Sequence, residues 1–133
     1  MPRSGKSFPW RITMSENQLV TLSKQFAVDM IRLCDAMKTR GKATAIINQL
    51  LRSGTSIGAN IHEANYASSK ADFINKFQIA LKECYETDYW LSVFHDAGIL
   101  SKEEFDIAFA NCSKLRKLLI ASITTAKKNN QMK

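Results

Sequence analysis

One segment of this 133-residue chain has residue types and a spacing that could support nucleophilic catalysis. Residues 54–58 read Gly-Thr-Ser-Ile-Gly and match the G-x-S-x-G pattern of the hydrolase nucleophile elbow. That elbow needs a strained turn between a strand and a helix, which exposes the serine above a sheet. Here the match lies within a helical repeat of apolar residues, and no strand precedes it. We therefore interpret it as small residues for helix packing, and we expect no enzyme activity.

The histidines and cysteines do not form a metal or redox motif. Di-iron sites in helical bundles need Glu-x-x-His pairs, but neither His62 nor His95 has a glutamate three residues earlier. The three cysteines lie far apart, outside any CxxC pair, and on or near apolar faces where cysteine acts as a small hydrophobe. We therefore predict no metal, no cofactor and a reducing, cytoplasmic location.

The charge pattern favours a polyanionic partner. The chain has 19 Lys and Arg against 12 Asp and Glu, which gives a net charge of +7. From position 113 onward every charged residue is basic. On a helical wheel these residues lie on or beside one outer face, and such a basic face is typical of phosphate binding. Such a face can also serve solubility alone, in which case the protein would be a protein–protein interaction module with no nucleic-acid role. The predicted nucleic-acid contacts are Lys114, Arg116, Lys117, Lys127 and Lys128.

Long helices must position these residues. Both prolines lie in the first nine positions, and apolar residues recur at spacings of three and four afterwards. We predict helices over about 15–41, 44–66, 69–98 and 101–126, which fold most simply as an all-α, antiparallel up-down-up-down four-helix bundle. Residues 1–14 are predicted to be a basic flexible arm, 15–126 the bundle and 127–133 a polar tail. No apolar run is long enough to span a membrane.

Local signals place the helix ends and the inner faces. Ser15 with Gln18, and Ser101 with Glu104, have the spacing of capping boxes. The predicted inner faces consist of Leu19, Leu22, Phe26, Met30, Leu33 and Met37; Ala43, Ile46, Leu50, Ile57, Ile61 and Ala64; Phe73, Phe77, Ala80, Cys84, Leu91 and Phe94; and Phe105, Ala108, Cys112, Leu115, Leu119 and Ala126.

The third predicted helix is also apolar on its outer side. A helix that is hydrophobic on two sides needs burial on two sides, and a lone bundle buries only one. This second strip therefore favours a subunit interface, although scattered exposed apolar residues are common. The strip consists of Ile79, Trp90, Val93 and Ala97, and Glu86 lies between them.

A polar stripe runs along the second predicted helix beside its apolar face, at spacings of four and three from Gln49. Most of its side chains are short, and Gly54 and Gly58 would allow a neighbouring helix to approach closely. We interpret the stripe as a packed polar seam, in which Asn60 and Glu63 bond to Arg52 of the same or another subunit; the alternative is a solvated face. The seam residues are Arg52, Ser53, Ser56, Asn60 and Glu63.

The same region carries a resemblance to a known family. Residues 52–63 read RSxxSIxANIxE, followed by SKxDF at 69–73, IAL at 79–81 and ETxYWL at 86–91. This pattern resembles the bacterial four-helix bundle family, or S23-like proteins, encoded in intervening sequences of 23S ribosomal RNA genes. The resemblance implies a homopentameric ring. Through a relative, the accessory variability protein of diversity-generating retroelements, it also implies RNA and a reverse transcriptase as partners.

Overall fold

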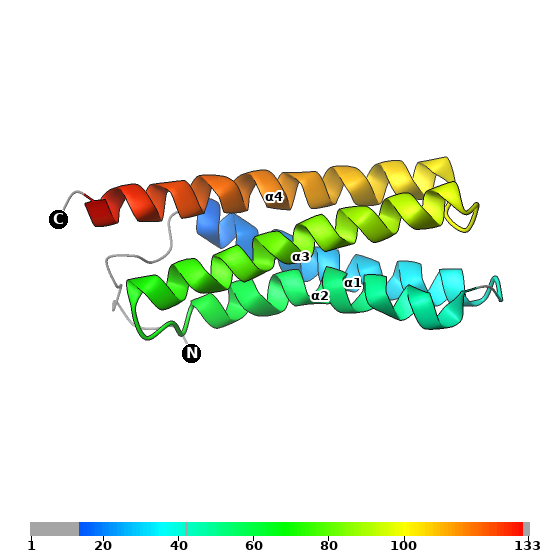
Figure 1. Ribbon diagram of the computed structural model, residues 1–133, viewed down its shortest axis with the longest axis horizontal. Helices are drawn as coiled ribbons and strands as arrows, with labels where there is room; N and C mark the ends of the chain where they lie inside the picture. The colour runs from blue at the N-terminus through cyan, green and yellow to red at the C-terminus, as the bar shows by residue number, and fades with distance from the viewer. Residues whose placement is uncertain (1–13, 42, 132–133) are drawn as a thin grey trace.

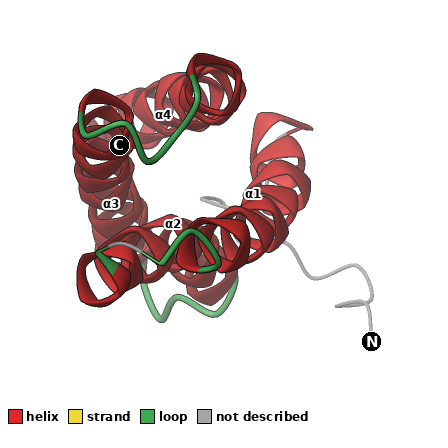
Figure 2. Ribbon diagram, turned by 90° about the vertical axis from the view of Figure 1, so that its right-hand side faces the viewer, coloured by secondary structure: helices red, strands yellow, loops and turns green. Residues whose placement is uncertain are grey.

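The structure, a computed structural model, describes residues 14–41 and 43–131 and contains four helices there. These are α1 (Met14–Lys38), α2 (Thr44–Ala64), α3 (Lys70–Asp96) and α4 (Lys102–Gln131), and no strand occurs within the described ranges (Figure 1). Each helix packs most extensively against its neighbour in sequence, and the α1–α4 contact is the least extensive (Figure 2). The predicted all-α four-helix bundle is confirmed. Nearly all of the predicted basic arm lies outside the described residues, and α4 continues to Gln131.

Side-chain caps start two of the helices, and one of them is the capping box predicted at Ser101. The Ser101 hydroxyl accepts a hydrogen bond from the Glu104 backbone N–H at 3.1 Å, and the Glu104 carboxylate accepts one from the Ser101 N–H at 3.0 Å. Ser69 likewise accepts from the Asp72 N–H at 3.0 Å. α1 begins at Met14, one residue before the predicted start, and the Ser15 side chain lies outside the side chains that the structure describes.

Residues with a left-handed backbone conformation lie in the turns at one end of the bundle. Gly41 and Gly98 follow α1 and α3 with φ angles of +74° and +76°, a region that glycine enters without the Cβ penalty. Ala43, just before α2, also has a positive φ of 53° and offers no side-chain cap.

The core lies along the axis between all four helices, and most of the predicted inner faces are buried in it. One correction concerns α2, where Ile47 is fully buried while Ile46 is 47% exposed and Ala43 is exposed. Both isoleucines stand at an allowed helical spacing from Leu50, so periodicity alone does not separate them. Three further residues predicted for the core are only half-buried: Leu22, Leu33 and Phe105.

Glycines let α1 and α2 approach closely. A Cβ atom on Gly54 would lie 2.6 Å from Cγ of Met30, and one on Gly58 would lie 3.0 Å from the Ser23 carbonyl oxygen. The small residues of α2 therefore serve the α1 contact, whereas the neighbouring Ser53 faces α3.

Within residues 14–41 and 43–131, no helix is both long enough and apolar enough to cross a membrane.

Candidate functional site

A polar seam joins α2 to α3 inside the protomer. Ser53 and Thr87 are both fully buried, and the Thr87 hydroxyl donates to the Ser53 hydroxyl oxygen at 3.0 Å. Ser53 in turn donates to the Leu50 carbonyl at 3.3 Å. Both hydroxyls are therefore satisfied without water, as buried polar groups must be.

A cluster of ion pairs joins α2 to α3 at the exposed edge of this seam. Arg52 reaches from α2 to Glu83 at 3.3 Å and also pairs with Glu86. The indole N–H of Trp90 donates to Glu86 at 3.2 Å. The Arg52 hydrogen bond, aided by that of Trp90, lowers the pKa of Glu86, and Glu86 raises the pKa of Arg52. Three of the predicted seam or interface residues thus meet in one cluster.

The remaining seam residues bond elsewhere. Ser56 donates to the Arg52 carbonyl at 2.6 Å and Asn60 donates to the Ser56 carbonyl at 2.9 Å, both within α2. Glu63 pairs with Lys76 of α3 at 3.0 Å. Within one chain, Asn60 and Glu63 do not reach Arg52, because they lie two to three helical turns beyond it on α2. Bonds from these residues to Arg52 of another subunit stay a prediction. Ser56 lies in mid-helix, so the G-x-S-x-G match has no strand-to-helix turn.

The second apolar strip of α3 is half-buried within the protomer. Ile79, Glu86, Trp90 and Val93 all have intermediate exposure. The Trp90 ring packs against the core and stacks near Phe94, with ring centroids 6.1 Å apart. Part of the strip is therefore covered by the chain itself, and its use as a subunit interface stays a prediction.

The predicted nucleic-acid residues all lie on α4, where they separate into two groups. No acid follows Asp106 in the sequence. Four exposed lysines have no ion-pair partner among the described residues. Such unpaired cations are free to contact phosphates. These lysines are Lys114, Lys117, Lys127 and Lys128.

Arg116 forms the second group, because it is held against α3. Its Nε lies 3.5 Å from Asp88 Oδ2, it donates to the Ser113 hydroxyl at 2.9 Å, and its guanidinium lies 5.8 Å from the Tyr85 ring centroid. Burial raises the pKa of Asp88, and the nearby Cys112 thiol and the positive charge of Arg116 oppose that rise. The positive charge of Arg116 is therefore balanced by the partly buried Asp88 and is less available to a ligand than the charge of the four lysines.

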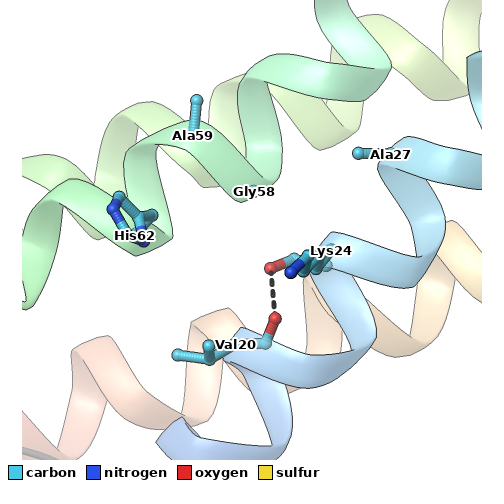
Figure 3. A pocket seen from close by; sticks show the side chains of 7 residues that line it. Val20, Lys24, Ala27, Gly58, Ala59 and His62 are labelled. Atoms are coloured by element: carbon cyan, nitrogen blue, oxygen red, sulfur yellow. Dashed lines mark hydrogen bonds between the residues drawn. The ribbon is translucent and has the colours of Figure 1, made fainter. Parts of the chain in front are cut away.

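Concave surfaces lie on both sides of α1, toward α2 and toward α4. A cavity of about 320 Å³ lies between α1 and α2 (Figure 3), where the Ser23 hydroxyl donates to the Val20 carbonyl at 3.3 Å. No carboxylate lines this cavity, although Lys24 and His62 border it. Among the described residues, no group of three or more His, Cys, Asp or Glu could hold a metal ion. A second cavity of about 290 Å³ lies between α1 and α4 and is lined by Phe26, Asp29, Met30, Leu33, Glu104, Ile107, Ala108 and Asn111.

Replacing Glu104 with glutamine should make the bundle less stable and change its acid response. Arg40 binds Glu104 through two hydrogen bonds of 3.0 and 2.7 Å, which with the Ser101 cap lower the pKa of Glu104 from 4.5 to about 2. A lowered carboxyl pKa contributes stability above about pH 4.5, and that contribution is lost as the pH falls toward 2. Because glutamine retains the cap but not the charge, we expect a loss of about 1 kcal/mol at pH 7.

Urea unfolding of both proteins between pH 3 and pH 7 would measure this difference. The wild-type advantage should shrink steadily below pH 4.5. A difference independent of pH would contradict a role for the Arg40–Glu104 charge pair.

Together these features define a four-helix bundle with an internal polar seam and a basic fourth helix. The chain belongs to the 23S rRNA-intervening sequence protein family, whose model matches residues 15–121. It is also similar to a protein of unknown function from the S23 ribosomal protein family of Bacteroides thetaiotaomicron, whose crystal structure has a TM-score of 0.80 and 41% sequence identity over 83% of this chain and 98% of that chain. Among curated proteins, none matches this chain.

Proposed function

We propose that this protein is a non-catalytic, homo-oligomeric scaffold that binds RNA through the exposed lysines of α4. The observation that carries the proposal is the charge separation along this helix: acids occupy only its first turns, and the unpaired lysines follow. Lysine contacts to phosphates are largely independent of sequence and are weakened by salt. Membership of a family described by 23S rRNA intervening sequences is compatible with an RNA-related role.

The assembly we propose is a homopentameric ring, as the family resemblance implies. A ring multiplies the charge of a +7 subunit and would concentrate a strong positive field on bound RNA. The sharpest form of the proposal is an accessory protein of a reverse transcriptase, which would bind the enzyme together with its RNA. The three cysteines are free and buried, which supports a cytoplasmic location.

A protein–protein interaction module is the second candidate, and the α1–α4 cavity favours it. Phe26, Met30 and Leu33 of α1 and Ala108 of α4 give this cavity an apolar lining, and Ile107 beside them is 59% exposed. Such exposed apolar surface is typical of an interaction site. In this alternative the basic face of α4 serves only solubility.

Light-scattering mass after size exclusion, with absorbance at 260 and 280 nm, tests the proposal. We expect a mass near five times 15.0 kDa at low salt, with nucleic acid that high salt removes. An assembly that never carries nucleic acid and does not retain added RNA would favour the protein-interaction module. A 15.0 kDa monomer would overturn the ring.

A further inference from the structure

Two tyrosines on α3 stand out among the exposed large side chains. Tyr85 is 52% exposed and Tyr89 is 61% exposed, although both belong to a long helix packed on two sides. They are four residues apart, so they lie on one face of α3 separated by one turn, with a rise of about 6 Å. Neither belongs to the core or to the α2–α3 seam, and the contacts within the protomer do not explain their exposure.

Each of the two rings is held in place by a contact with a neighbouring side chain. The Arg116 guanidinium from α4 lies 5.8 Å from the Tyr85 ring centroid, and Arg116 is itself fixed by Asp88. The Tyr89 ring meets Trp90 in a T-shaped arrangement with centroids 5.1 Å apart. Braced rings lose less side-chain entropy when a ligand packs on them than freely rotating rings do.

Basic, uncharged and ion-paired acidic side chains surround the two rings. On α3, exposed Lys82 precedes Tyr85 by three residues and exposed Ser92 follows Tyr89 by three residues, so all four share one outer line. From α4, the Arg116 guanidinium approaches the Tyr85 ring. Two of the nearby acids are held in ion pairs, Asp88 with Arg116 and Glu86 with Arg52, and exposed Asp96 lies about two turns beyond Tyr89, beside His95. A ligand on this face therefore meets aromatic surface flanked by positive charge.

We propose that Tyr85 and Tyr89 form a stacking platform for unpaired bases, so that the RNA bound here is single-stranded. This inference rests on the proposed function, which it extends from phosphate contact to base contact. Aromatic rings beside cations are the means by which proteins bind single strands, because every base offers a π-face for stacking. In a duplex the bases are already stacked on one another, so duplex RNA can use the lysines but not the platform.

Binding of two fluorescently labelled RNAs tests this inference: a 16-nucleotide single strand and a 16-base-pair duplex, measured by anisotropy at the same salt concentration. The wild-type chain should prefer the single strand. Y85A/Y89A should bind the single strand at least about 30-fold more weakly, since stacking on each ring is worth about 1 kcal/mol or more. Its affinity for the duplex should stay nearly unchanged, and Y85F/Y89F should bind like the wild type.

Tyr66 provides a matched control. It is 68% exposed and precedes α3, away from the platform, so Tyr66→Ala should leave both affinities unchanged. Full single-strand affinity in Y85A/Y89A would overturn the platform while the proposed function stands. Equal losses for single strand and duplex, or a fall in the light-scattering mass of Y85A/Y89A, would overturn it in favour of a structural or subunit-contact role. Binding of neither RNA by the wild type would overturn the proposed function as well.

Discussion

RNA affinity at 0.1 M salt is expected to fall by a factor on the order of 10² to 10³ when the four exposed lysines of α4 are changed to glutamate. Each lysine that contacts a phosphate releases about 0.7 counterion from a single strand, so four contacts give a salt slope of about −2.8. Removing them should flatten the slope by that amount. The variant is K114E/K117E/K127E/K128E, and filter binding across a salt series measures both quantities.

Net charge must be matched in the control for this experiment. Each change from lysine to glutamate lowers the charge by two, so four changes take the chain from +7 to −1. Changing four basic residues of α1 and α3 that form no ion pair among the described residues lowers the charge by the same amount: K24E/R32E/K38E/K70E. The control should keep most of its affinity if α4 contacts the phosphates. Equal losses in the two variants would show that only the overall charge matters, and unchanged binding in the α4 variant would overturn the assignment.

The largest stability effect outside the apolar core is expected at the Asp88–Arg116 pair. Asp88→Leu would leave the Arg116 guanidinium partly buried without its acid, and Arg116→Leu would leave the Asp88 carboxylate partly buried. In this structure Asp88 Oδ1 is already buried without a hydrogen-bond partner among the described residues. Each single variant should therefore lose about 2 kcal/mol of unfolding free energy, less than a fully buried pair would cost.

The double variant D88L/R116L separates this effect from ordinary packing loss. Two leucines can pack against each other between α3 and α4, and replacing a buried ion pair by apolar residues is often neutral. We expect the double variant to lie within about 1 kcal/mol of the wild type in urea unfolding. Simple addition of the two single losses would show that Asp88 and Arg116 do not act as a pair.

Much of the fold can be predicted from the sequence because its signals are local. The spacing of apolar residues indicates four helices, and Ser101 with Glu104 forms the predicted capping box. The prediction failed where two residues fit the pattern equally well. Ile46 and Ile47 both suit the helical repeat, and only the packing of the helices determines that Ile47 is the buried one. A serine near a helix start, such as Ser15, also does not reveal that the helix begins one residue earlier.

The candidate site was less predictable, because a side chain's partner depends on the neighbouring helix. Arg116 and Lys117 are adjacent cations in sequence, yet only Arg116 is held by Asp88 of α3. Arg52 pairs with Glu83 and Glu86 for the same reason, through the register between α2 and α3. The exposed tyrosines could have been predicted, because the sequence places two aromatic residues four apart on an outer helical face.

The small contact between α1 and α4 also bears on how quickly the protomer folds. All the extensive helix contacts join neighbours in sequence, so each helix can pack as soon as the short turn before it forms. Only the least extensive contact, between α1 and α4, brings together segments that are far apart in sequence. Helical proteins with such local contacts fold in roughly microseconds to milliseconds. Each protomer can therefore complete its own structure well before it diffuses to a second copy or to RNA.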